Sequence, residues 1–138
     1  MVFCYNLNMQ DSLLIVFLSA IAIGILIEVA YRSYWASKFI SPRFMNIQMY
    51  IWIGFILYFL YISQINFIYK IIIILITTTG IEYITGYLYL KHKKEKLWDY
   101  SEEKYNFKGI ICLKFSIYWL LLSLAYYFLF LPLVVYVV

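Results

Sequence analysis

Residues 67–90 read FIYKIIIILITTTGIEYITGYLYL, and this stretch decides the fold. Its only charged side chains are Lys70 and Glu82, so it is long and apolar enough to cross the hydrocarbon core, which takes about 20 residues of α-helix. The run from Ile71 to Ile76 is apolar on every side, whereas a membrane β-strand alternates apolar and polar positions. The stretch therefore predicts a transmembrane helix and argues against a barrel.

The rest of the chain has the same apolar character. Of its 138 residues, 66% are hydrophobic and 13% are charged, whereas about 25% are charged in a soluble domain. A chain this apolar cannot hide its hydrophobic surface inside a small globule, so the bilayer must act as its solvent. We expect an all-α fold, an integral membrane four-helix bundle that forms a single transmembrane domain over residues 1–138, with helices at about 12–35, 47–63, 67–90 and 110–133.

Lysine and arginine mark the loops that are expected on the cytoplasmic side. Neither end of the chain carries them outside the predicted helices, nor does the loop at 64–66. They gather instead in the first loop with its flanks and in the third loop, at Arg32, Lys38, Arg43, Lys91, Lys93, Lys94, Lys96, Lys104 and Lys108. We therefore expect a multi-pass membrane protein with both termini outside.

The chain offers little for metals, cofactors or nucleic acid. Its two cysteines fall in different segments, and its one histidine, His92, cannot build a zinc site alone, so we expect no metal and no cofactor. The basic tract at 91–96 adjoins a helix, which favours contact with anionic membrane lipid over binding of nucleic acid.

Two similar segments each place a glutamate within a predicted helix. Ile27–Glu28 and Ile81–Glu82 both lie in the cytoplasmic half of an odd-numbered helix. This echo raises the hypothesis of two parallel helical hairpin repeats, an arrangement that some transporters use, although the match is short and chance also explains it.

Glu28 has a cation within reach on its own helix. Arg32 lies four residues further on, which is the favourable order for a helical ion pair. Ala20 and Gly24 precede them in the same row, and small residues allow a neighbouring helix to approach closely.

Glu82 has no cation within one turn of its own helix. Its face carries small and hydroxyl-bearing residues, which should turn toward the bundle interior: Thr78, Thr79, Thr85, Gly86 and Tyr89. The carboxyl group is expected to stay protonated or to meet a cation from another helix, because an isolated charge within a membrane is costly. We expect Glu28 and Glu82 to approach each other or to share a partner such as Arg32. The pair is either a clamp between the first and third helices or a polar binding and translocation site.

The third loop contains the box Trp98, Asp99, Tyr100 and Ser101, followed by Asn106. Trp98 suits the membrane interface, and the next residues can turn and cap a short helix that begins near Glu102. Asn106 and, further on, a glycine suit a turn before the last helix. The residues thus favour a folded cytoplasmic corner, with a direct ligand role as the alternative.

The same box also carries a family resemblance. Residues 81–85, 97–101 and 109–113, with Asn106 and Trp119, resemble the putative ABC-transporter type IV family of small membrane proteins from Gram-positive bacteria, as does Ile27 to Ser33. The resemblance covers about half of the chain and implies a permease-like protein of a bacterial plasma membrane. Residues 41–46 depart from it, because the glycines and the proline-rich segment that the family typically carries after its first helix are absent here.

These observations leave several functions open. The first is a permease-like subunit, which would act as an oligomer or with a separate cytoplasmic ATPase docked on the third loop, because the chain holds no phosphate-binding Gly-x-x-x-x-Gly-Lys motif. The second is a self-associating pore or effector, and the third is an assembly protein without transport. An intramembrane enzyme is less supported, because two carboxyl groups and one loop histidine identify no reaction, and we expect none.

Overall fold

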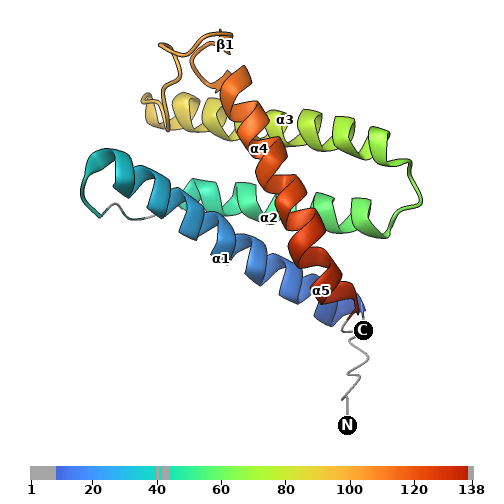
Figure 1. Cartoon of the computed structure of the whole chain (residues 1–138). Coiled ribbons are helices and arrows are strands. Elements are labelled where there is room, and N and C mark those ends of the chain that lie inside the picture. Colours follow the sequence, from blue (N-terminus) through green and yellow to red (C-terminus); the bar gives the residue numbers. More distant parts are fainter. Residues whose placement is uncertain (1–8, 40, 42–43, 137–138) are drawn as a thin grey trace.

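The computed structural model describes residues 9–39, 41 and 44–136. Its long elements are helices, which confirms the all-α membrane fold (Figure 1). In chain order the elements are α1 (Met9–Ala36), α2 (Phe44–Ile62), α3 (Phe67–Lys93), β1 (Asn106–Phe107), β2 (Ile111–Cys112), α4 (Leu113–Ala125), the π-helical turn η1 (Tyr126–Phe130) and α5 (Leu131–Tyr136). Pro42 and Arg43, which belong to the predicted first loop, lie outside the described residues.

Three of the described helical segments are long and apolar enough to cross a membrane: Gln10–Ala36, Phe67–Lys93 and Leu113–Val134. The second helix, α2, is shorter, but its 19 residues extend about 28 Å, which nearly matches a hydrocarbon core of about 30 Å. Figure 1 places the α1–α2 connection and the third loop toward one end of the bundle, and the α2–α3 turn and both termini toward the other. That arrangement is the one a chain with four crossings requires.

Small residues bring α1 and α2 together. A Cβ atom on Gly54 would lie 2.6 Å from the Ala20 Cβ atom, and one on Gly24 would lie 2.3 Å from Cγ of Tyr50. Both distances are shorter than carbon atoms tolerate, so the two backbones meet where side chains are missing. The predicted close approach is therefore present, and its partner is α2.

The last crossing contains a widened turn. The Leu131 amide donates to the carbonyl of Tyr126, five residues back, instead of to the carbonyl four residues back. Pro132 explains the change, because a proline ring clashes with the carbonyl four residues earlier and brings no amide of its own. The two consecutive tyrosines of this turn contact different helices. The Tyr126 hydroxyl lies 2.8 Å from Ser19 Oγ on α1, while the Tyr127 hydroxyl accepts from Lys70 Nζ on α3 at 3.1 Å.

The third loop folds as a small hairpin and not as the short helix expected near Glu102. Strands β1 and β2 pair antiparallel, with Phe107 opposite Ile111, and residues 101–105 form turns. Three residues, Lys108, Gly109 and Ile110, connect the strands, and the first two have φ values of 55° and 67°, as the central residues of a type I′ turn require. Because β2 occupies Ile111–Cys112, the last helix begins at Leu113, three residues after the predicted start.

Candidate functional site

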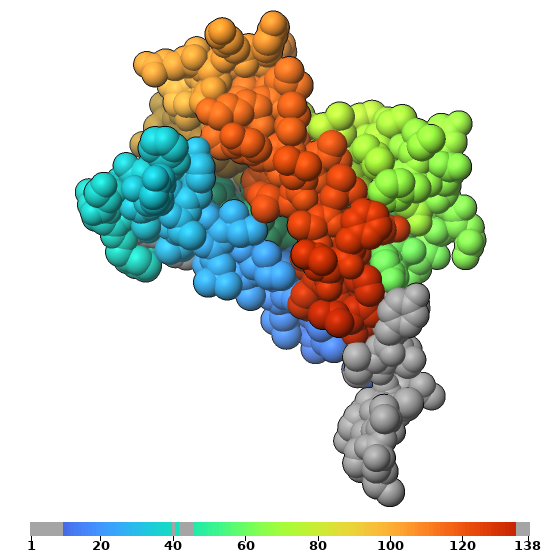
Figure 2. Space-filling model, viewed as in Figure 1, coloured from blue at the N-terminus to red at the C-terminus, as the bar shows by residue number. Residues whose placement is uncertain are grey.

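A pocket of about 570 Å³ lies between α1, α2, α4 and the third loop, and one residue of α3, Glu82, reaches it. The space-filling view shows it as a hollow between the blue α1 and the orange α4 (Figure 2). Both glutamates singled out in the sequence line it, so they face one interior space and not the lipid. Their hydrogen bonds differ, however, because Glu28 accepts from Arg32 and Tyr50, whereas Glu82 accepts from Tyr100.

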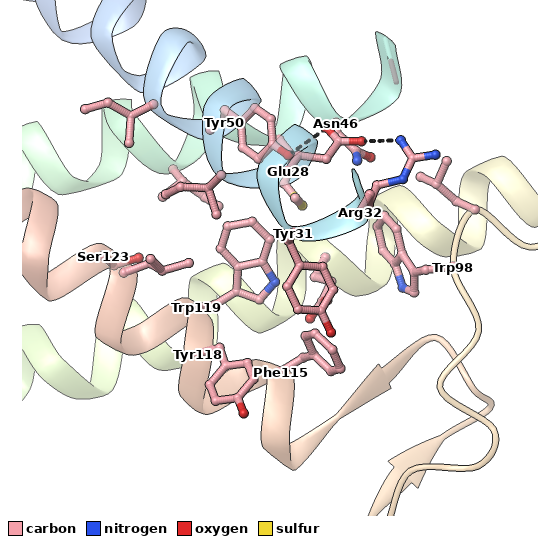
Figure 3. Close-up of a pocket in the computed structure, with 18 of the residues that line it drawn as sticks. Glu28, Tyr31, Arg32, Asn46, Tyr50, Trp98, Phe115, Tyr118, Trp119 and Ser123 are labelled. Carbon is pink, nitrogen blue, oxygen red and sulfur yellow. Dashed lines mark hydrogen bonds and ion pairs between the residues drawn. The ribbon is translucent and has the colours of Figure 1, made fainter. Parts of the chain in front are cut away.

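Glu28 is held by a salt bridge and a hydrogen bond (Figure 3). Arg32 Nη1 donates to its Oε1 at 2.9 Å, and the Tyr50 hydroxyl donates to its Oε2 at 3.0 Å. Arg32 also donates to the Ser41 carbonyl at 3.0 Å, which ties the end of α1 to the following loop. The ion pair predicted from the sequence is thus present. The clamp joins α1 to α2, whereas the sequence had suggested α1 to α3.

Glu82 is the more deeply buried of the two, with 1% of its surface exposed. The Tyr100 hydroxyl donates to its Oε1 at 3.0 Å. Its Oε2 is buried and accepts no hydrogen bond from the described residues; the Trp119 indole lies beside the carboxyl group without hydrogen-bond geometry. No salt bridge reaches Glu82 within the described part of the chain. A membrane-embedded carboxyl group therefore faces the pocket without a cation.

The three threonines of the predicted polar face do not line this pocket. Thr78 is buried on the same row as Glu82 and donates to the Ile74 carbonyl at 2.8 Å. Thr79 keeps its hydroxyl oxygen buried with no hydrogen-bond partner among the described residues, and Thr85 is half-buried. The buried row of α3 runs in steps of four residues, so positions three residues from Glu82 turn away from it.

Aromatic rings form the wall of the pocket. Tyr100 stacks on Phe115 with centroids 4.4 Å apart, and Phe115 meets the edge of Tyr31 at 6.0 Å. Trp98 extends this series on the loop side, and Trp119 packs against Tyr50 at 6.2 Å on the other side. Figure 3 shows the rings of Tyr31, Phe115 and Trp119 around the space between α1 and α4. Sequence reasoning treated Trp98 as an interfacial anchor and missed the roles of Tyr31, Tyr50 and Trp119, because only tertiary packing brings them together.

The pocket opens sideways through a window between α1 and α4 (Figure 2). The two helical segments meet at each end of it: the Tyr126 hydroxyl contacts Ser19 on one side, and Phe115 contacts Tyr31 on the other. Ser19 and Tyr31 are 12 residues apart on α1, which corresponds to about 18 Å of helix. Such a window faces the lipid wherever no other protein covers it.

Four residues of the box build the corner predicted from the sequence. Asn106 Nδ2 donates to the Glu103 carbonyl at 2.8 Å, and its Oδ1 accepts from the Gly109 amide at 3.1 Å. Trp98 Nε1 donates to the Ile110 carbonyl at 2.6 Å. Asp99 Oδ1 accepts from Lys96 Nζ at 2.7 Å and from the amide and hydroxyl of Ser101. These bonds, first of all the one from Lys96, lower the pKa of Asp99 to about 2.

Tyr100 is the box residue whose polar group reaches Glu82. Burial, together with the neighbouring Glu82 carboxyl group, raises the pKa of the Tyr100 phenol far above its ordinary value, so this hydroxyl remains a hydrogen-bond donor. Trp98 and Asp99 also line the pocket, whereas Ser101 and Asn106 lie outside it. In the described part of the chain, no three acidic, cysteine or histidine residues gather closely enough to hold a metal ion.

Comparison with known proteins places the chain in one family. The model of the family described as "Putative ABC-transporter type IV" matches residues 15–138. No curated protein and no solved structure matches the chain. The match covers most of α1 and all of α2, α3, the third loop and α4, with both glutamates. The chain therefore belongs to the putative ABC-transporter type IV family of membrane proteins.

Proposed function

We propose that this protein is a permease-like membrane subunit of a transporter and that the pocket holds its substrate. The observation that carries the proposal is the pocket itself: it lies among helices that can span a membrane, contains both Glu28 and Glu82, and has a window between α1 and α4. Substrate sites of transporters commonly lie near the middle of the bilayer between helices, and intramembrane carboxyl groups mark such paths.

The packing of the described core favours a site that is closed on one side, in preference to an open pore. The pocket extends from the acidic residues of the third loop to the level of Ala20 and Leu57. Beyond it lie the apolar side chains of Val16, Ile74 and Leu131, each 1% exposed or less. A permease opens to one side of the membrane at a time, and this arrangement corresponds to the state that is closed at the end carrying the termini. The self-associating pore therefore remains the weaker alternative.

The charge pattern favours an orientation with both termini outside, in what we propose is the plasma membrane of a bacterium. The third loop holds most of the lysines, and it lies toward the same end of the bundle as the α1–α2 connection (Figure 1). A cytoplasmic position for that end follows the positive-inside rule.

A separate ATPase would supply the energy, since the chain has no phosphate-binding loop. The hydrogen-bonded corner of the third loop is our candidate docking surface, because it projects Tyr105 and Phe107, which are 82% and 53% exposed. Four crossings are few for a translocation path, so an oligomer would supply further helices. A second copy would also cover the window.

Purification of the tagged full-length chain from its native membranes tests this proposal. We expect an ATPase to co-purify, and we expect Tyr105→Ser together with Phe107→Ser to reduce its recovery. The control is Tyr34→Ser, which changes a 78% exposed tyrosine near the end of α1. Recovery of the chain without any ATPase or second membrane protein would count against the permease role. Ion leak from liposomes that contain the chain alone would favour the pore.

A further inference from the structure

We propose that the pocket binds an organic cation, an ammonium group on an apolar body, with the ammonium held between Glu82 and the aromatic wall. This inference names a ligand class for the site of the proposed permease, and it rests on that function only for the fate of the bound molecule. Binding itself can be measured without transport.

The charges that line the pocket exclude an anion and favour a cation. Arg32 is the one basic residue of the lining, against the carboxyl groups of Glu28, Glu82, Asp99, Glu102 and Glu103. Three of these five have a cation of their own, because Glu28 pairs with Arg32, Asp99 with Lys96 and Glu103 with Lys114. Glu82 has none within the described residues, although it is the most buried.

The hydrogen bonds of Glu82 leave room for a donor. Tyr100 occupies Oε1, and Oε2 is buried without a hydrogen bond among the described residues. A buried acceptor without a partner is costly, and more so when it is charged. An ammonium N–H directed at Oε2 would satisfy that oxygen and neutralise the carboxylate in the same contact.

The wall of the pocket suits the rest of such a molecule. Trp98, Tyr100, Phe115 and Trp119 present rings to the space, and the faces of such rings attract cations within about 6 Å. The volume, about 570 Å³, falls within the range of about 300–1,000 Å³ typical of small-molecule sites. A sugar or another highly polar neutral ligand would need more hydrogen-bonding side chains than this aromatic surface provides.

Two sources can supply this chemistry. A free amine can enter from water at the third loop, and the headgroup of an aminolipid such as phosphatidylethanolamine can enter through the window between α1 and α4. The recognition is the same in both cases, so the experiment has one arm for each source.

The first arm uses the purified full-length protein in dodecyl maltoside, a neutral detergent, titrated with phenethylamine or with 3-phenylpropionate of similar size. Trp98 and Trp119 line the pocket, so intrinsic fluorescence reports on its occupancy. We expect saturable binding of the amine and none of the carboxylate. Glu82→Gln should weaken amine binding at least tenfold, whereas Glu95→Gln, an exposed loop glutamate outside the pocket, should leave it unchanged.

The second arm measures which lipid stays with the protein after purification from a bilayer of phosphatidylethanolamine and phosphatidylglycerol, using native mass spectrometry. Retention of phosphatidylethanolamine that Glu82→Gln abolishes assigns the lipid source, and amine binding without lipid retention assigns the free one. If Glu82→Gln does not fold, Trp119→Leu replaces it, with a several-fold loss expected from the missing ring.

Three results would overturn the inference: equal binding of amine and carboxylate, an affinity unaffected by either pocket variant, or neither amine nor aminolipid bound. If one of these results is obtained while an ATPase still co-purifies, the ligand class is rejected and the permease role remains supported. If the chain binds the amine but no ATPase or second membrane protein co-purifies, the ligand class is supported and the permease role is rejected.

Discussion

Replacing Gly24 by alanine should destabilise the protein, although alanine is the better helix former. The added Cβ atom would lie 2.3 Å, 2.5 Å and 2.7 Å from three ring carbons of Tyr50, where contacting carbons need about 3.5 Å. The ring cannot simply move away, because Tyr50 is 5% exposed and its hydroxyl is bonded to Glu28. Either α1 and α2 must separate by about 1 Å or the ring must shift and give up that bond.

The magnitude follows from these two outcomes. Overpacking of a close contact costs about 1–3 kcal/mol. Loss of a hydrogen bond to a charged group adds about 1.5–3 kcal/mol, while the change from glycine to alanine within a helix returns up to about 1 kcal/mol. The net loss in the free energy of unfolding should be about 2–4 kcal/mol, given that the two costs partly replace each other.

Gly80 provides the matched control. It lies within α3, and a Cβ atom there would have no other atom within 4 Å outside its own helix. Gly80→Ala should therefore stabilise the protein by up to about 1 kcal/mol. Both variants can be compared by reversible unfolding in mixed micelles, followed by circular dichroism.

A double-mutant cycle tests the cause. In a Tyr50→Ala background, which removes Cγ and the ring carbons that the added Cβ would meet, Gly24→Ala should cost less than about 1 kcal/mol. Equal effects of Gly24→Ala and Gly80→Ala, or a cost at Gly24 that persists without the ring, would refute the explanation by close contact.

Three further predictions concern the corner of the third loop. Asp99 has a pKa near 2, below its ordinary value of about 3.9, so its bonds contribute fully above about pH 4 and are lost as the pH falls through 2. The protection factor of the Ser101 amide, measured by NMR and corrected for the intrinsic pH dependence of exchange, should therefore fall between pH 4 and pH 2 in the wild type and not in Asp99→Asn. Asn106→Ala should loosen the corner by about 2 kcal/mol because it removes hydrogen bonds to Glu103 and Gly109, and hydrogen–deuterium exchange over 100–112 should increase. Gly86→Ala places a Cβ atom 2.7 Å from Cγ2 of Ile110, so proteases should cleave the loop faster, and an unchanged cleavage rate would show that the corner does not pack on α3 as described.

The helices could be predicted because the bilayer imposes a length on every crossing. Residues 67–90 satisfy that length by composition alone, and α3 begins at the predicted Phe67. The last crossing was harder, because its start depends on the hairpin turn that contains Lys108 and Gly109, and its far end depends on the widening caused by Pro132. The hydropathy of the sequence contains no signal for either of these local effects.

The site was only half predictable for a similar reason. Glu28 and Arg32 share a helix, so their spacing already fixes their pairing. Glu82 and Tyr100 do not share one, and no periodicity links them. The threonines near Glu82 differ in their offset from it, which the sequence analysis did not weigh. An offset of three lies about 60° to one side on a helix and an offset of four about 40° to the other, and the buried row of α3 follows the steps of four, which include Thr78 but not Thr79 or Thr85.

The two similar glutamates therefore have different surroundings, and this difference suggests a different role for each. Glu28 has both oxygens occupied, one by the Arg32 cation, so its charge is neutralised and its bonds hold α1 to α2. Glu82 has a single tyrosine, an oxygen without a hydrogen-bond partner among the described residues, and no cation on any described element. An intramembrane carboxyl group without a cation must stay protonated or gain a cationic partner, because an isolated charge in the membrane costs several kcal/mol. We infer that Glu28 acts as the clamp and that Glu82 is available to a ligand that brings a positive charge.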